Sequence, residues 1–258
     1  MTVLGTPYRL GSTSYVWPAG LVANVRRLGS LVDDVELVLF DLEDQSNLPD
    51  EETVADLQVL ARAHDLTYTV HLPLDLNPAC TASLEQAAKV INCTRELSPQ
   101  AYVLHLDGRA VEGDPDRATV ARWRRGARQA LRAVEGMLDE PERMCVENLE
   151  NYPPEHLLPL FAETPASLCI DVGHLWLTGR DPRAFLEAYL AQTRLIHLHG
   201  ASQRDHQSLR QQGTGPVAAV LSLLAARCFD GVLTLEVFGQ EDFASSRALV
   251  CEILDGKH

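Results

Sequence analysis

The stretch that most constrains this chain is Ser167 to His174, SLCIDVGH, in which an apolar run ends abruptly in an aspartate. A buried strand that delivers polar side chains at its end has this pattern. Gly173 allows the backbone to turn after Asp171, which brings His174 back over the end of the strand. The stretch therefore predicts two metal ligands held close together.

Three further apolar runs end in the same way, in carboxylate or imidazole side chains. MCVENLE carries Glu147, LIHLHG carries His197 and His199, and LTLEVFG carries Glu236. Oxygen and imidazole ligands from separate strands favour Zn, Mn, Fe or Co over a thiolate site. Each of these residues alone is more often a hydrogen-bonded buried group than a ligand. The coincidence of four such runs predicts a divalent transition metal, Zn or Mn above all, with donors for two or more ions.

Strand-like and helix-like stretches alternate along all 258 residues, from RLGSTSYVW (9–17) to GVLTLEVFG and the closing helix FASSRALVCEIL. Other strands are expected at 35–41, 66–73, 101–108 and in the four runs above, and EHLLPLFAE is expected to form the helix after the fifth strand. Eight such pairs without a linker predict the α/β class and a (β/α)8 TIM barrel, with residues 1–258 as one domain.

A barrel of this kind carries its site at the C-terminal ends of the strands, where the polar residues of this chain are concentrated. His71 and His105 also close predicted strands, and Asp41 closes another. The nine histidines are distributed unevenly, since only His64, His156 and His258 lie away from strand ends and their loops. This distribution favours a functional site over a merely polar mouth.

The composition limits the partners. Acidic residues outnumber basic ones by 36 to 22, giving a net charge of −14, which argues against a nucleic-acid partner but not against a small anionic ligand. No apolar stretch approaches the roughly 20 residues of a membrane span, and the N-terminus lacks a secretory signal pattern. We therefore expect a soluble, cytoplasmic protein with no membrane partner.

The six cysteines contain no C-x-x-C pair, so neither a disulfide framework nor a structural zinc site is expected. Cys145 and Cys169 precede Glu147 and Asp171 by two residues, which places each cysteine on the same inward face as its ligand, one layer deeper. Both are expected to pack in the core.

These residues together resemble the xylose isomerase-like barrels, a group that includes sugar isomerases, sugar epimerases and abasic-site nucleases of the endonuclease IV type. The resemblance covers the whole barrel and implies a shared metal set of Glu147, Asp171, His174, His197 and Glu236. The nuclease branch adds a histidine after the third and fourth strands, which His71 in VHLP and His105 in LHLDG match. This match implies phosphoester chemistry with more than one metal ion.

Within that group, GSTSYVWPAGLVANV, VDDVELVLFD and SLCIDVGHLW are similar to the cobamide-remodelling phosphodiesterases. The similarity implies a metal-dependent hydrolase that cleaves the nucleotide-loop phosphodiester of a corrinoid substrate such as adenosylcobalamin, giving cobinamide phosphate and a nucleoside. The chain departs from the nuclease pattern at Gly200, where an acid is expected, and in having Asp205 and His206 adjacent rather than one residue apart. These departures leave the ligands of a third ion undefined.

A metal-bound hydroxide would attack phosphorus in such an enzyme. Glu147 and Glu236 would bridge ions or orient the water, His199 would be a ligand or a hydrogen-bond partner of one, and Asp205 or His206 would hold a metal or protonate the leaving group. The expected substrate-binding residues are Tyr15 and Trp17 for the corrin and Arg109, Arg180 and Arg204 for the phosphate, although packing or surface roles are open for each.

Other functions remain open from the sequence alone. A sugar isomerase or epimerase would use a divalent metal together with a lysine or a second glutamate for proton transfer, and Lys89 and Lys257, the only lysines, lie away from strand ends. An abasic-site nuclease is disfavoured by the acidic charge. A non-catalytic corrinoid- or metal-binding protein is the remaining alternative, and the oligomeric state is not specified by the sequence.

Overall fold

The computed structural model describes residues 2–41, 44–73, 75–77, 80–202 and 204–256, so Lys257 and His258 lie outside the described residues. Eight parallel strands close into a barrel in chain order, and β8 pairs with β1. The strands are β1 (Arg9–Thr13), β2 (Asp34–Val38), β3 (Thr67–His71), β4 (Tyr102–Leu104), β5 (Met144–Glu147), β6 (Ser167–Asp171), β7 (Thr193–Leu198) and β8 (Val232–Leu235). The predicted (β/α)8 barrel is confirmed.

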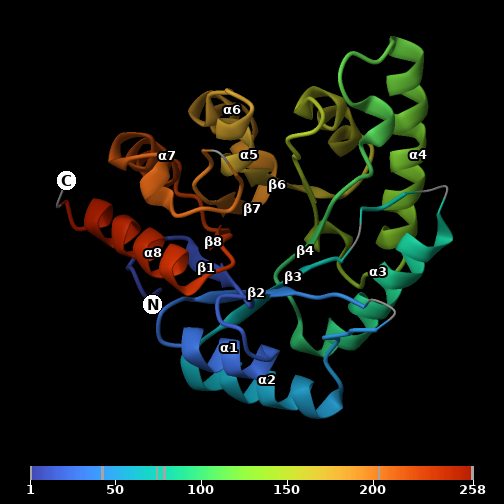
Figure 1. The fold of residues 1–258 in the computed structure, drawn as a ribbon. Helices are drawn as coiled ribbons and strands as arrows, with labels where there is room; N and C mark the ends of the chain where they lie inside the picture. The colour runs from blue at the N-terminus through green and yellow to red at the C-terminus, as the bar shows by residue number, and fades with distance from the viewer. Residues whose placement is uncertain (1, 42–43, 74, 78–79, 203, 257–258) are drawn as a thin grey trace.

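Helices surround the strands on all sides (Figure 1). They are α1 (Leu21–Leu28), α2 (Glu51–His64), α3 (Thr81–Thr94), α4 (Arg117–Glu135), α5 (Val172–Leu177), α6 (Pro182–Tyr189), α7 (Thr214–Ala226) and α8 (Gln240–Leu254). Asp50 and Asp116 cap α2 and α4 by accepting a hydrogen bond from the backbone N–H three residues later. In the described part of the chain, no helix has the length and apolar character needed to cross a membrane.

The strands are shorter than the sequence pattern predicted. Strand β1 ends at Thr13 rather than at residue 17, and β4 ends at Leu104 rather than at residue 108, because the chain turns outward into the mouth loops after three to five paired residues. The expected helix in EHLLPLFAE is replaced by two short 3-10 helices, Pro154–His156 and Leu158–Ala162. Prolines in this segment remove backbone donors that a longer helix needs.

The interior of the barrel is layered. A buried apolar layer contains one residue from each of β4 to β8 and the residue before β4: Ala101, Val103, Cys145, Cys169, Leu195 and Val232. The predicted core packing of Cys145 and Cys169 is therefore confirmed. Because side chains alternate along a strand, the residues two positions later point into the barrel above this layer. The polar mouth consequently rests on an apolar floor.

Asp34 is a buried carboxylate on β2, inside the barrel. Thr67 and Thr69 of the neighbouring strand donate hydroxyl hydrogen bonds of 2.6 and 2.8 Å to it. Burial raises the pKa of Asp34 to about 6, although both hydrogen bonds act to lower it. Asp34 therefore costs stability once it ionises in the folded protein.

We expect Asp34→Asn to raise the free energy of unfolding at pH 7.5 by about 1–3 kcal/mol, since one pKa unit corresponds to roughly 1.4 kcal/mol. The folded-state pKa lies above the unfolded value of about 3.9, so the wild type loses stability as the pH rises from about 4 to 6, and the asparagine variant does not. Urea unfolding at pH 4 and pH 7.5 measures this. An equal difference between the two proteins at both pH values would contradict the assignment.

Candidate metal centre

The C-terminal mouth of the barrel collects every residue that the sequence predicted as a metal ligand. Strands β3, β5, β6 and β7 supply His71, Glu147, Asp171 and His197, the loops after β4 and β8 supply His105 and Glu236, and the first turn of α5 supplies His174. His199, Asp205 and His206, predicted as catalytic or accessory groups, lie in the same cluster. Most of these side chains are buried, so their charges are shielded from water.

His197 lies at the centre of the cluster and faces three carboxylates. Its Nδ1 is 3.0 Å from Glu236 Oε2, 3.4 Å from Glu147 Oε2 and 3.8 Å from Asp171 Oδ2. Among the described residues, neither His197 Nδ1 nor Glu236 Oε2 has a hydrogen-bond partner although both are buried. Buried polar atoms are rarely left unsatisfied. A shared divalent cation satisfies both, so Glu147, Asp171, His197 and Glu236 fit a transition metal in number and in donor type.

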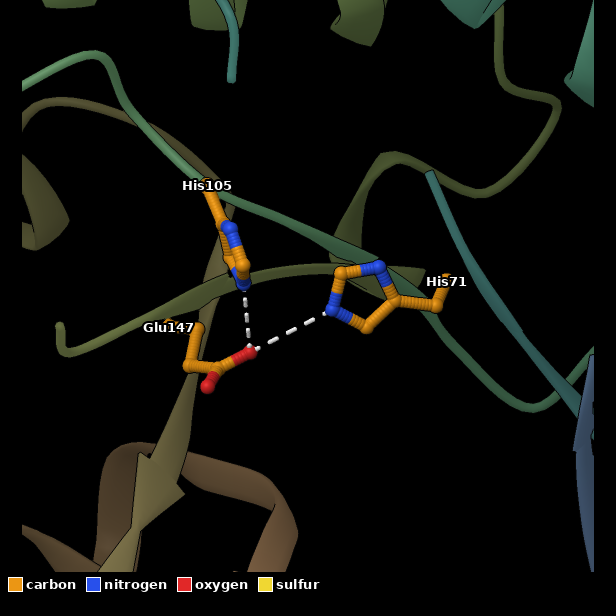
Figure 2. A group of neighbouring side chains, drawn as sticks. All are labelled: His71, His105 and Glu147. Carbon is orange, nitrogen blue, oxygen red and sulfur yellow. Dashed lines mark hydrogen bonds and ion pairs between the residues drawn. The ribbon is translucent and has the colours of Figure 1, made fainter. Parts of the chain in front are cut away.

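Glu147 also belongs to a second donor set, together with His71 and His105 (Figure 2). His105 Nε2 and His71 Nε2 lie 3.0 and 3.5 Å from the same Glu147 oxygen, Oε2. The two rings are in edge-to-face contact, with centroids 4.8 Å apart. The ligand atoms of His71, His105 and Glu147 all lie within 4.8 Å of one another, close enough to share one ion.

A third donor set surrounds His174. Asp171 caps α5 by accepting a hydrogen bond of 2.6 Å from the His174 backbone N–H, which fixes the histidine beside the strand end. His174 Nε2 lies 3.0 Å from Asp205 Oδ2, and His199 Nε2 lies 3.1 Å from Asp171. His206 has a φ of 52°, a left-handed conformation that turns the chain so that adjacent residues 205 and 206 both face the cluster.

The carboxylates set the charge of the histidines. Burial alone would lower the pKa of His174, but Asp171 and Asp205 raise it to about 11. Burial also acts to lower the pKa of His105, but Glu147 raises it to about 10. For His199, burial acts in the same direction, and Asp171 raises the pKa to about 9. In return, although burial acts to raise the pKa of Glu147, the imidazoles hold it well below its usual range. Without a metal, protons neutralise this cluster.

The predicted substrate-binding residues lie around the mouth, and carboxylates already hold two of the three arginines. Arg109, with 78% of its side chain exposed, pairs with Asp107, and Arg180 pairs with Glu155 at 2.6 Å. Arg204 is exposed and lies 3.9 Å from Asp242.

The two predicted aromatic residues differ in their surroundings. Trp17 packs edge-on against Phe243 of α8, with ring centroids 6.2 Å apart, beneath the guanidinium of Arg27. The packing alternative for Trp17 is therefore the arrangement that the structure shows. Tyr15 follows the end of β1 and is half exposed.

The sequence analysis missed Glu36, which is fully buried on β2 and accepts a hydrogen bond of 3.0 Å from His197 Nε2. The sequence held one signal for it: in VDDVELVLFD, Glu36 lies two residues after Asp34, so both acids are on the same face of the strand. It also missed Phe238, an exposed ring after β8 that contacts the His206 ring at 4.9 Å. Asp41, expected at the site, instead pairs with the exposed Lys89 at 2.9 Å.

The fold and the donors define a (β/α)8 barrel with a divalent-metal site at its mouth. The chain belongs to the xylose isomerase-like TIM barrel family, whose profile matches residues 22–252. A search of curated proteins finds no match.

Among solved structures, the chain is similar to a D-tagatose 3-epimerase-like protein, with 20% identity, a TM-score of 0.78 and coverage of 96% of this chain and 98% of the other. An L-ribulose 3-epimerase has 18% identity and a TM-score of 0.70, with coverage of 97% and 95%. A 3-keto-D-glucoside 4-epimerase from E. coli has 13% identity and a TM-score of 0.70, with coverage of 95% and 98%. At these identities the likeness establishes the fold.

The expectation of a hydrolase acting on a cobamide phosphodiester is wrong. The similar solved structures described above are two sugar epimerases and a protein named as 3-epimerase-like, and none is a phosphodiesterase or is named for a corrinoid. The reason lies in the residues used for the expectation. The expected metal ligands were the same for each branch considered, so they did not distinguish a phosphodiesterase from an epimerase. The opening stretch that favoured corrinoids includes Trp17, which packs against Phe243 of α8.

We expect divalent metal binding to tighten as the pH rises, because the histidines with raised pKa values must lose protons before they can act as ligands. For each proton that is released on binding, the Mn²⁺ dissociation constant should fall about tenfold per pH unit between pH 6 and 8. Isothermal titration in two buffers of different ionisation enthalpy measures the affinity and the proton release together. His156→Ala, outside the cluster, is the control. Affinity that does not vary with pH would exclude these histidines as ligands.

Proposed function

We propose that this protein is a divalent metal-dependent sugar epimerase. The observation that carries the proposal is the placement of Glu147 and Glu236 at the two ends of the central donor set. Going around the barrel, β5 supplies Glu147, β6 and β7 supply the two ligands between, and the residue after β8 supplies Glu236. Both carboxylates approach the same nitrogen of His197, at 3.4 and 3.0 Å.

Epimerisation beside a carbonyl needs two acid–base groups. One removes a proton from one face of the carbon, and the other returns a proton to the opposite face. The described lysine, Lys89, is exposed and paired with Asp41, away from the cluster, so the two glutamates are the candidates. A bound divalent ion would polarise the carbonyl and hydroxyl oxygens of the sugar and make the neighbouring C–H more acidic.

The surroundings of the cluster suit an uncharged sugar. Arg109 and Arg180, which could otherwise meet a phosphate, are already paired with Asp107 and Glu155, and this favours an uncharged substrate over a phosphorylated one. The imidazole of His206 is partly exposed and offers a hydrogen-bonding group for hydroxyls. Phe238, beside His206, offers an exposed apolar face for the C–H side of a sugar ring. The similar solved structures named as 3-epimerases support a ketose as the substrate class.

We expect the Mn²⁺-loaded protein to interconvert a ketose and its C3 epimer, with deuterium entering at C3 when the reaction runs in D₂O. Tagatose, fructose, allulose and ribulose form a suitable panel, and NMR follows both the epimer and the deuterium. Glu147→Gln and Glu236→Gln should each lower epimerisation by about 10²–10⁴-fold, as expected for loss of an acid–base group.

The two variants should also differ from each other. If each carboxylate serves one face, each variant should still exchange the C3 hydrogen of one epimer and not of the other. Lys89→Met, which removes a surface ion pair, is the control with unchanged activity. Retention of C3 hydrogen by every sugar, with metal present in stoichiometric amount, would refute the epimerase proposal. Interconversion of a ketose with an aldose instead would identify an isomerase.

A further inference from the structure

Glu36 is a buried charge without an evident structural role. Its side chain is fully enclosed within the barrel, and His197 is the one residue in the described ranges that hydrogen-bonds its carboxylate. The other oxygen, Oε1, is buried without a described partner. Burying a carboxylate this way is costly, and an apolar residue at such a position often favours the fold. We therefore look for the function of Glu36 in its hydrogen bond to His197.

The two nitrogens of His197 face different surroundings. Nε2 lies 3.0 Å from Glu36 Oε2, in hydrogen-bonding geometry. Nδ1 faces the carboxylates of Glu236 and Glu147 and has no hydrogen bond within the described chain. A neutral imidazole that donates its Nε2–H to Glu36 therefore presents the lone pair of Nδ1 to the central donor set. The ring itself is fully buried, so solvent does not compete for either nitrogen.

We propose that Glu36 is the positioning residue of the metal centre, holding the proton of His197 on Nε2 and aiming Nδ1 at the ion. The inference rests on the metal site of the proposed function. Carboxylates that accept from a metal-bound histidine fix its tautomer, orient its ring and increase its basicity. Glu36 thus acts through His197 and need not touch the ion or the sugar.

The other histidines of the cluster show why this pair stands apart. His174, His71 and His199 direct Nδ1 to backbone carbonyls, those of Asn148, Leu72 and Gly200. His105 faces the carboxylate of Asp75, which is half exposed. His199 also bonds a fully buried carboxylate, that of Asp171, but Asp171 belongs to the central donor set, whereas Glu36 bonds His197 from outside that set. Glu36 therefore supports His197, the histidine at the centre of the central donor set.

The test measures Mn²⁺ affinity and the visible spectrum of the Co²⁺-substituted protein, without using activity. Glu36→Gln should weaken Mn²⁺ binding about 10–100-fold and change the Co²⁺ spectrum, because the amide neither fixes the tautomer nor supplies the charge. Asp34→Asn is the matched control, since Asp34 is on the same strand and inward face, is equally buried and bonds threonines instead of His197. It should bind Mn²⁺ within about twofold of the wild type, as expected for a residue outside the ligand network.

A double-mutant cycle separates positioning from general damage. In the His197→Ala background, Glu36→Gln should have no further effect on Mn²⁺ affinity, because its partner is gone. Unchanged affinity in Glu36→Gln, or an equal loss with and without His197, would overturn the inference. Circular dichroism checks folding. If Glu36→Gln does not fold, Glu36→Asp, which keeps the charge but withdraws the oxygen from Nε2, carries the same expectation.

The two proposals fail separately. A wild type that binds Mn²⁺ through the Glu36–His197 pair but epimerises no sugar leaves the inference standing and refutes the proposed function. Epimerase activity with a Glu36→Gln variant of normal Mn²⁺ affinity does the reverse.

Discussion

Three carboxylates converge on one buried imidazole nitrogen, and the rest of the mouth is arranged around that convergence. Glu147, Asp171 and Glu236 all lie within 3.8 Å of His197 Nδ1. Like charges this close repel strongly away from water, so the arrangement requires cations. Protonated histidines supply them when no metal is bound, and a divalent ion supplies them more compactly. Metal binding is therefore coupled to proton loss and to the stability of the mouth.

The barrel tolerates this charge because, on three of its strands, the ligand lies two residues beyond a side chain of the buried apolar layer. On β5, β6 and β7 the inward sequence runs from Cys145 to Glu147, from Cys169 to Asp171 and from Leu195 to His197. The lower member of each pair belongs to the apolar layer, which excludes water from below. The upper member is held by the pairing of strands on both sides, so a ligand position is as rigid as the barrel itself.

The sequence predicts the barrel and the ligands for the same reason. Alternation of strands and helices defines the fold, and a strand that ends in Asp171 or Glu147 places that residue at the mouth. Glu36 escaped prediction because a carboxylate within a strand is usually solvent-facing, and only the closed barrel shows that this face is interior. The rim was less predictable still, since the positions of Trp17 and Arg180 depend on loop packing. Function was mispredicted because the same set of expected ligands suits more than one metal-dependent reaction.

The histidines around Glu147 bear on how many ions the proposed epimerase should hold. The same oxygen, Glu147 Oε2, lies 3.4 Å from His197 Nδ1, 3.0 Å from His105 Nε2 and 3.5 Å from His71 Nε2. An ion held by His71 and His105 would bind the oxygen that the central donor set also uses, so Glu147 would be shared between two ions and would be a weaker base. With one ion in the central set, His105 instead holds Glu147 by a hydrogen bond of 3.0 Å, and the neighbouring imidazoles keep the carboxylate ionised. A second ion at His71 and His105 therefore weakens Glu147 as a base, and the proposed epimerase chemistry is best served by a single ion.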